Sequence, residues 1–442
     1  MVEPLSVLVV GGGIGGLCLA HGLVRAGIEV QVAERAQART DWVQGYRIHI
    51  DPDGSRALHA CLPAASWERF CDTVSDEAAT FSFRTEQLAP LLVIDVARAD
   101  DPVAQHHGIS RIALREVLLD GLADVVTFGR EFERYETLPD GRVRAHFADG
   151  TTAEADLLVG ADGANSRVRG QLLPHARRLD TGVTTIAGKH PLTGGGPHGD
   201  GGLPPELLAG PTTVLPPGPG GMFTAVWRGD RQRATASQQD DRQQATACQQ
   251  GDTADVQCPQ CHPADVSPGF LFDTTTDYVF WAYADATATF PPLDGRTGPE
   301  LTAVVAERIA GWSPGLRRLV AGSAPDTVNA LRIRSAEPVT AWPTGPVTLL
   351  GDAIHNMTPM AGIGANTALR DADLLRRNLI AAGPDVTAAV ADYERRMLDY
   401  GFAAVARSLR NTRFATSGHR VARGLLRAVN LVPPLKRRML GS

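Results

Sequence analysis

The sequence predicts an α/β protein in which a Rossmann-like sheet is assembled from separated stretches of one chain. Residues 5–10 (LSVLVV) form a short apolar run, residues 17–27 repeat apolar positions with helical spacing, and residues 28–35 (IEVQVAER) alternate as strands do. This order indicates a β-α-β unit. Two more apolar strands are predicted at residues 157–159 and 347–350, so the sheet draws on distant parts of the chain and its domain is discontinuous.

The rest of the chain divides into two further regions. Residues 181–330 carry strand-like runs, such as MFTAVW and YVFWAYA, between stretches rich in Gly and Pro, which predicts a β-rich second domain. Residues 381–442 have helical periodicity and predict a helical C-terminal region. The discontinuous domain then comprises residues 1–180 and 331–380. A duplicated polar segment predicts a disordered insertion at about residues 231–266 of the second domain.

Size and composition exclude several classes of protein. The chain has 442 residues, 43% of them hydrophobic, and it can bury a large cofactor. A net charge of −6 lacks the basic excess that binding to a phosphate backbone requires, so nucleic acid is not expected as a partner. No apolar run reaches the roughly 18 residues of a membrane span. With no export signal recognised, we expect a cytoplasmic enzyme with reduced cysteines, as a monomer or homodimer.

A glycine-rich turn follows the first predicted strand, with its glycines in G-x-G-x-x-G spacing at the start of a helix. Gly11 permits the tight turn, Gly13 lets the backbone approach a pyrophosphate, and Gly16 allows close packing of the helix. The amides expected to face the anion at the positive helix end belong to Ile14 and Gly15. The pattern predicts a dinucleotide-binding site.

An acidic residue closes this unit at the end of the next strand. Glu34 is expected to accept hydrogen bonds from an adenosine ribose, and Arg35 beside it to stack near the adenosine, with a surface cation as the alternative. The strand, helix, strand and carboxylate coincide, which argues against a chance glycine-rich turn. This motif alone does not separate NAD from FAD.

Two further motifs follow the later strands of the sheet. Residues 160–169 read GADGANSRVR, and residues 351–372 read GDAIHNMTPMAGIGANTALRDA. Together with the first motif, they resemble the signatures of class A flavoprotein monooxygenases, the family related to p-hydroxybenzoate and salicylate hydroxylases. The resemblance implies an FAD-binding domain, FAD as cofactor, and NADPH or NADH as a transient reductant.

The resemblance assigns roles around the third motif. Asp352, directly after Gly351, is expected to hydrogen-bond the ribityl hydroxyls of the flavin, with a helix cap as the alternative. Gly362 and Gly364 fit a turn that brings backbone amides and a helix N-terminus to the pyrimidine ring. Asn366 is expected beside the ring as a side-chain donor. Pro359 is expected near the site where oxygen reacts.

The second motif and two neighbouring segments complete the expected site. Asp162 and Gly163 match positions that in the family lie near the FAD pyrophosphate, with an ordinary turn as the alternative. Arg111, in SRIALR (110–115), is expected to reach the phosphate or ribityl region. In GYRIHI (45–50), Arg47 or His49 is expected to face the flavin.

These features predict an enzyme that uses NAD(P)H and O₂ to oxygenate an apolar substrate, aromatic or polyketide-like. The flavin performs the difficult chemistry, so no metal is required. Epoxidation, Baeyer-Villiger insertion and dehydrogenation use the same scaffold and stay open. Alternation in residues 278–284 places Trp281 and Tyr283 on one face of a strand and Phe280 on the other, so only one set lines a pocket. Trp227 is a further candidate for the lining.

Two features suggest other functions. Cys258, Cys261 and His262 match the C-x-x-C-H pattern of haem attachment, with Cys248 nearby, which keeps a haem or metal electron carrier as a remote alternative. Their place in the polar insertion favours free thiols. The last 43 residues contain nine Arg or Lys and no acid. Helices laid on acidic parts of the protein explain this tail better than contact with a membrane surface.

Overall fold

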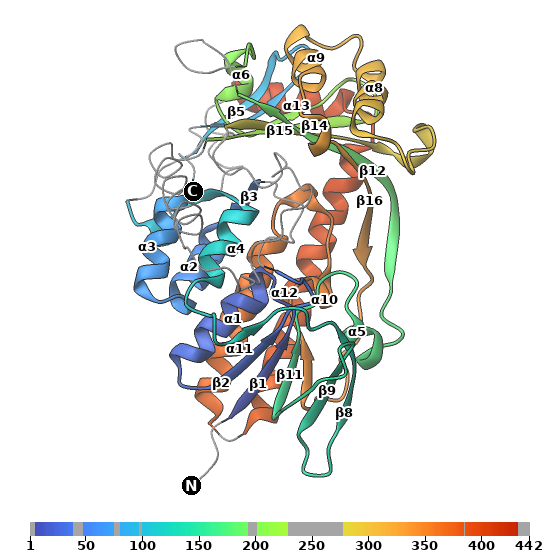
Figure 1. Ribbon diagram of the computed structural model, residues 1–442. Helices are drawn as coiled ribbons and strands as arrows, with labels where there is room; N and C mark the ends of the chain where they lie inside the picture. Colours follow the sequence, from blue (N-terminus) through green and yellow to red (C-terminus); the bar gives the residue numbers. More distant parts are fainter. Residues whose placement is uncertain are drawn as a thin grey trace, which may run out of the picture.

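The computed structural model describes residues 5–38, 47–74, 80–96, 100–192, 201–228, 277–383 and 385–431. A five-stranded parallel sheet, ordered β17-β11-β1-β2-β7, occupies the lower half of Figure 1. Its strands are β1 (Ser6–Val10), β2 (Glu29–Ala33), β7 (Val126–Thr127), β11 (Leu157–Gly160) and β17 (Val347–Leu349). The sheet draws on four distant segments, which confirms the predicted α/β class with a discontinuous Rossmann-like domain.

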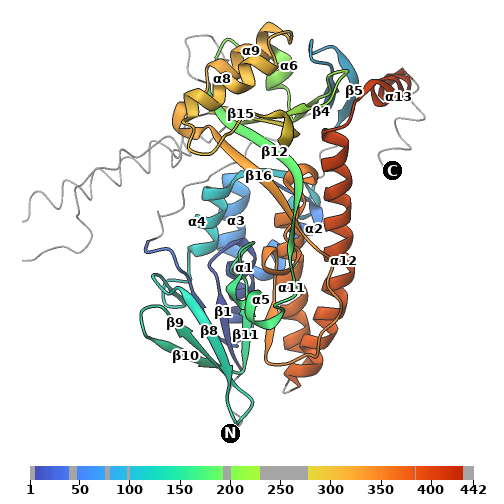
Figure 2. The same cartoon turned by 90° about the vertical axis from the view of Figure 1, so that its right-hand side faces the viewer.

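Helices cover one face of this sheet and a small antiparallel sheet packs against the other (Figure 2), which explains why β1 and β11 read as continuous apolar runs. Within this layer α1 packs against α11, and α11 packs against α2 and α12. The helices are α1 (Ile14–Arg25), α2 (Pro52–Cys61), α3 (Ala64–Thr73), α4 (Arg111–Leu119), α11 (Gly364–Ala382) and α12 (Val386–Ala415). Fully buried side chains such as Val9, Leu17 and Leu375 form one core between the helices and the strands.

A second sheet of seven strands, ordered β16-β12-β15-β14-β13-β4-β5, occupies the upper half of Figure 1. Helices α6 (Pro205–Leu208), α8 (Gly298–Arg308) and α9 (Pro314–Ala321) cover its outer face. The strands are β4 (Thr80–Arg84), β5 (Pro90–Asp95), β12 (Arg178–Pro191), β13 (Thr212–Val214), β14 (Gly221–Trp227), β15 (Tyr278–Ala286) and β16 (Asn329–Ala336). A strand-rich second region was predicted, and the structure has it.

The expected boundaries of that region need correction. We expected all of residues 1–180 in the first domain, but β4 pairs in parallel with β13, Ser82 opposite Thr212, and β5 pairs with β4. Likewise most of β16 lies beyond residue 330, yet β16 pairs with β12. These strands join the large sheet because pairing partners far apart in sequence are invisible to local periodicity.

The C-terminal region is helical, as predicted. Helix α12 runs from the parallel sheet up to the large sheet, where α13 (Arg420–Leu431) packs beside β5 (Figure 2). Arg423 forms an ion pair with Glu86 at 2.7 Å, and the Oδ1 atom of Asn430 accepts a hydrogen bond from the Val93 amide at 3.3 Å. Part of the basic tail therefore lies on its own chain.

The structure bears only partly on the two features that suggested other functions, the cysteine-containing insertion and the basic C-terminal tail. The polar insertion, with Cys248, Cys258, Cys261 and His262, lies outside the described residues. Across the ranges given above, no helix combines the length and the apolar character that crossing a membrane requires.

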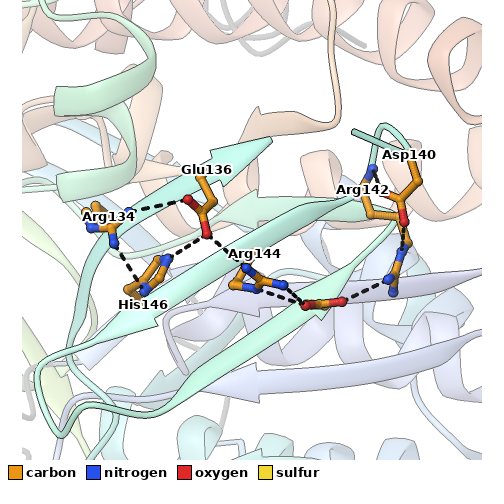
Figure 3. A network of polar contacts seen from close by, with 7 residues as sticks. Arg134, Glu136, Asp140, Arg142, Arg144 and His146 are labelled. Atoms are coloured by element: carbon orange, nitrogen blue, oxygen red, sulfur yellow. Dashed lines mark hydrogen bonds and ion pairs between the residues drawn. The ribbon is translucent and has the colours of Figure 1, made fainter. Parts of the chain in front are cut away.

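A small antiparallel sheet covers the face of the parallel sheet opposite α11 and α12, away from the large sheet (Figures 1 and 2). It consists of β8 (Phe132–Thr137), β9 (Val143–Phe147) and β10 (Thr152–Ala155). On its surface Arg144 donates to Glu154 and Glu136, and Arg142 donates to Glu154 and Asp140, forming the network of Figure 3. Exposed ion pairs contribute little individually, so this network links strands rather than building a site.

Candidate functional site

One cavity of about 1750 Å³ extends from the carboxyl ends of the parallel strands to the inner face of the large sheet. This exceeds the roughly 300–1,000 Å³ of a typical small-molecule pocket. The predicted site residues that line it are Gly11, Gly13, Ile14, Gly15, Gly16, Glu34, Arg35, Arg47, His49, Arg111, Asp162, Gly163, Gly351, Asp352, Pro359, Gly362 and Gly364. The cavity therefore brings together nearly all of them, leaving out Asn366.

The glycine-rich turn has the geometry that each glycine suggests. Gly11 has φ of +113°, and a Cβ there would collide with the carbonyl oxygen of Ala161. A Cβ on Gly16 would collide with the Gly11 carbonyl, which explains the close approach of α1 to the strand. A Cβ on Gly13 would meet no atom within 4 Å. Gly13 thus borders open space in the cavity, as a backbone that approaches a bound ligand would.

The N-terminus of α1 points its unpaired amides toward this space. The helix begins at Ile14, its N-cap residue Gly13 makes no side-chain cap, and its first turn has no acidic residue. The positive end of the helix dipole is therefore left to an anion from outside the protein.

Glu34 is buried beside the same turn and is held by two backbone amides. Its Oε2 atom accepts from Gly12 at 2.7 Å, and its Oε1 atom accepts from Ala36 at 2.8 Å. These bonds fix the carboxylate at the cavity wall while each oxygen keeps a further lone pair for a ligand hydroxyl. Arg35 is exposed where it lines the cavity.

In the turn after β11, the two carboxylate oxygens of Asp162 have different surroundings. Its Oδ2 atom accepts from the amides of Arg167 at 2.7 Å and Val168 at 3.2 Å, which begins α5 (Arg167–Leu172). Its Oδ1 atom is buried and has no hydrogen-bond partner among the described residues. A buried oxygen without a partner is costly, so it favours a donor supplied by a ligand. Gly163, with φ of +77°, makes the turn possible.

The turn after β17 presents Asp352 to the cavity. Gly351 adopts φ of +64° and precedes α10 (Asp352–His355), and the Asp352 side chain is exposed. Asp352 is not the N-cap of this helix, since Gly351 holds that position. Burial lowers the pKa of Arg111, and the negative charge of Asp352 partly opposes that shift. An exposed carboxylate and a buried cation thus line the same cavity.

A buried network fixes this turn from behind. The carboxylate of Asp371 accepts from the Gly351 amide at 2.8 Å, from His355 Nε2 at 2.7 Å and from the Tyr400 hydroxyl at 2.5 Å. Burial lowers the pKa of His355, but the charge and hydrogen bond of Asp371 outweigh it, so that the pKa is raised overall. This support cannot be recognised in the sequence, because His355, Asp371 and Tyr400 come together at Gly351 only in the folded chain.

The segment after α10 forms a second helix N-terminus at the cavity. Pro359 begins a short 3₁₀ turn (Pro359–Ala361), and Gly362 ends it with φ of +65°. Helix α11 follows at Gly364, with no side-chain cap and no acidic residue in its first turn. This arrangement can offer amides to an electron-rich ring edge.

Asn366 does not take the expected role of a donor beside the ring. Its Nδ2 atom donates to the His49 carbonyl at 2.9 Å, and its Oδ1 atom accepts from the Asp51 amide at 2.9 Å. The side chain is 3% exposed and does not line the cavity. Both ends of the amide connect α11 to the end of β3 (Arg47–Ile50) and the residue after it, so Asn366 positions the backbone at His49 and Asp51 instead.

Arg47 and His49 both reach the cavity from β3, which pairs with β6 (His107–Ser110). His49 Nε2 lies 3.0 Å from Nδ1 of His106, with the rings stacked. Burial, together with the positive charges of His106 and Arg47, lowers the pKa of His49 to about 4. His49 is therefore neutral near pH 7.

The large sheet supplies an apolar wall. Phe280, Ala282 and Ala284 of β15 line the cavity, whereas Trp281 and Tyr283 are buried on the opposite face beneath α8 and α9. The aromatic set facing the cavity is thus the one that contains Phe280. Trp227 does not line the cavity and stacks on Tyr278, with ring centroids 5.4 Å apart.

Several lining residues escaped sequence analysis. Phe81 and Phe83 enter from β4, and Leu425 enters from α13. The alternation of the two phenylalanines was a detectable sign of a strand with one aromatic face, but nothing local related it to the large sheet.

The residues of the cavity fit a dinucleotide cofactor. Open space beside Gly13, two uncapped helix N-termini, the unsatisfied Oδ1 atom of Asp162 and the exposed carboxylate of Asp352 border one continuous volume. The same cavity continues to an apolar wall, which neither a phosphate nor a ribose would need for binding. Fold and site together define a cofactor-binding domain whose cavity is bordered on its far side by the large sheet.

Comparison with known proteins identifies the family. The family model of the FAD binding domain matches residues 4–186 and 322–408, more than half of the chain. The chain therefore belongs to the FAD-binding flavoprotein monooxygenase family, as the three motifs predicted, and FAD is its cofactor.

Individual relatives agree with this assignment. The chain is 32% identical over 399 residues to the dual O-methyltransferase/FAD-dependent monooxygenase elcB of Phaeosphaeria nodorum, covering 84% of this chain but only 40% of that protein. It is 29% identical to the 3-amino-4-hydroxybenzoate 2-monooxygenase PtmB3 of Streptomyces platensis, covering 89% and 84% of the two chains. A solved structure from Photorhabdus luminescens, described as an FAD-containing monooxygenase, is 34% identical with a TM-score of 0.75, covering 93% and 98%.

Proposed function

We propose that the protein is an FAD-dependent monooxygenase that takes electrons from NADPH or NADH and inserts one oxygen atom of O₂ into an apolar, aromatic or polyketide-like small molecule. In this reaction the second oxygen atom leaves as water, and the nicotinamide cofactor is oxidised. The observation that carries the proposal is the single cavity that continues from the dinucleotide turn to the apolar wall around Phe280.

Different residues of the chain would hold different parts of the cofactor. The amides at the start of α1 would bind the pyrophosphate, Glu34 the ribose, and Asp352 with Arg111 the ribityl and phosphate region. The N-terminus of α11 would face the pyrimidine edge of the ring and stabilise negative charge there. When bound, the flavin would accept two electrons from the nicotinamide and activate O₂.

The large sheet would hold the substrate and exclude water. Phe280, Phe223 and Phe83 line its side of the cavity, where they offer apolar contact to a planar ring. A dry site matters because water would promote loss of the activated oxygen as peroxide before it reaches the substrate. The similarity to a monooxygenase named for an aminohydroxybenzoate substrate supports the aromatic class.

Product analysis tests this function. Purified protein with FAD is supplied with NADPH or NADH and a panel of phenols, aromatic acids and polyketide-like aromatics, and consumption of the reductant and product mass are followed. The proposal expects substrate-stimulated consumption and a product heavier by one oxygen atom. A product that has only lost two hydrogens would indicate a dehydrogenase instead. Product structure would separate hydroxylation from epoxidation and Baeyer-Villiger insertion.

A further inference from the structure

Helix α13 packs beside β5, at one end of the cavity (Figure 2). Three of its residues, Ala422, Leu425 and Leu426, line the cavity. Leu425 is nonetheless 63% exposed, and Phe414, which lines the cavity from the end of α12, is 39% exposed. Side chains that line the cavity and also reach the solvent mark an opening. One mouth of the cavity therefore lies beside α13.

The side of α13 that faces its own chain makes polar contacts. Arg423 pairs with Glu86 and also donates to the carbonyl of Leu215 at 3.3 Å, while Asn430 accepts from the Val93 amide. These contacts account for the part of the basic tail that was expected to lie on the protein itself. They leave the opposite side of the helix without such contacts.

That opposite side is apolar and exposed. Val421 is 76% exposed and Leu431 is 80% exposed, and no residue of α13 is buried. Because residues three and four apart share one face of a helix, Val421, Leu425 and Ala428 form an exposed apolar stripe, with Leu431 beside it. A surface helix normally turns such a stripe to the core and its polar face to water. The reverse arrangement in α13 indicates a surface that binds a partner.

Positive charge borders this stripe. Arg420 and Arg427 are exposed, lie two turns apart on the same edge of the stripe, and form no ion pair in the part of the chain that the structure describes. No Asp or Glu follows Asp399 in the sequence. A partner that carries negative charge beside apolar groups fits this combination. The interface of a bilayer with anionic lipids offers both, and amphipathic helices of this composition lie in it.

The size of the stripe argues against a second copy of the chain as the partner. A helix of 12 residues is about 18 Å long and about 10 Å wide, so one face covers roughly 200 Å². A stable protein–protein interface buries about 800 Å² on each partner. A bilayer requires no matching surface of that size, because apolar side chains enter it individually.

We propose that α13 binds the surface of a membrane that contains anionic lipid. Its apolar stripe lies at the boundary between headgroups and acyl chains, and Arg420 and Arg427 contact the headgroup phosphates. The contact is peripheral, since 12 residues are too few for a span of about 20. Docked in this way, the mouth beside Leu425 opens toward the lipid, which dissolves apolar molecules. Membrane binding is independent of the proposed function, and only the entry of an apolar substrate by this route rests on it.

Vesicle binding by the full-length protein with FAD tests this inference. Vesicles of phosphatidylcholine, with or without phosphatidylglycerol, are floated on a density gradient, and the bound fraction of protein is measured. The wild type is expected to bind the anionic vesicles more tightly and to dissociate as salt is added, because salt screens exposed charges. Arg420→Gln and Arg427→Gln should each lower the affinity for anionic vesicles about fivefold.

The double variant Val421→Ser/Leu431→Ser tests the apolar stripe separately from the charges. Its affinity should fall by about tenfold or more, because less apolar surface enters the bilayer. Neither residue lines the cavity, so its FAD content should equal that of the wild type. The matched control is Arg377→Gln/Ile380→Ser, which removes an exposed arginine and an exposed apolar side chain from α11 and should bind vesicles as the wild type does.

Three results would overturn the inference. One is a wild type that binds neither kind of vesicle. Another is wild-type affinity for anionic vesicles in the variants that lack both arginines or both apolar side chains. The third is a wild-type dimer in analytical ultracentrifugation that Val421→Ser/Leu431→Ser converts to a monomer, without vesicle binding, which would assign the stripe to a second copy. No measurement here uses the reductant or a substrate, so a failure of the proposed function remains separately visible in the product assay.

Discussion

A substitution at Gly13 should weaken cofactor binding with little effect on protein stability, because the space beside Gly13 belongs to the cavity. Its backbone has φ of −84° and ψ of 179°, which any residue adopts, and an added Cβ meets no protein atom within 4 Å. Gly13→Val should therefore fold, with a stability change within about 1 kcal/mol, because the weaker N-cap offsets the smaller entropy of the unfolded chain. The valine side chain would instead occupy the space of the pyrophosphate.

The expected loss of affinity follows from the amides that the pyrophosphate would no longer reach. Losing two charge-assisted hydrogen bonds costs about 3–6 kcal/mol, roughly a hundred- to ten-thousand-fold in Kd. Gly11→Val should behave differently, since its φ of +113° and its collision with Ala161 destabilise the fold itself, by about 1–3 kcal/mol for the backbone alone. Gly170→Val is the matched control, because Gly170 is also open but lies outside the cavity.

Flavin absorbance per protein and chemical unfolding of the apoprotein measure the two quantities separately. The expected pattern is a folded Gly13→Val protein without flavin, an unstable Gly11→Val protein, and a Gly170→Val protein that retains FAD. Stoichiometric flavin in folded Gly13→Val, or unfolding of that variant, would refute the assignment of this space to the cofactor.

Three further predictions concern other parts of the site. Asp352→Ala should weaken FAD binding by about 1–3 kcal/mol without loss of fold, since its carboxylate faces the cavity and is not the helix N-cap; wild-type flavin affinity would count against it. His49, with its pKa lowered to about 4 from 6.5, should make the wild type gain stability as pH rises between these values, since the unfolded state then binds more protons. Denaturant midpoints for His49→Gln should lack this rise, and an unchanged slope would contradict the assignment. Replacing Cys248, Cys258 and Cys261 together by Ser should leave flavin content and turnover near wild type, because flavin oxygenation needs no thiol; loss of turnover with FAD retained would reveal a working thiol or metal site.

Local motifs allowed the cofactor domain to be predicted because their geometry is set within a few residues. The positive φ of Gly11 and the open space beside Gly13 follow from the spacing of a strand, a turn and a helix. The same holds for Gly351, which follows β17 as the N-cap of α10 and places Asp352 at the cavity. Such features require no knowledge of distant pairing.

Positions decided by distant contacts were not predictable in this way. Asn366 resembles a ring donor in its motif, but its partners at His49 and Asp51 lie 317 and 315 residues away in sequence. The alternation of β15 correctly divided Phe280 from Trp281, yet helices bury one face and the cavity occupies the other, so composition could not choose between them.

The fate of molecular oxygen decides whether the protein is a monooxygenase. The purified protein with FAD is given NADPH, isotopically labelled O₂ and the best substrate of the aromatic panel, and the product is weighed by mass spectrometry. We expect one labelled oxygen atom in each product molecule and one NADPH consumed for each product molecule formed. Oxidation of the reductant that yields only peroxide with every substrate of the panel, or a product without the label, would contradict it.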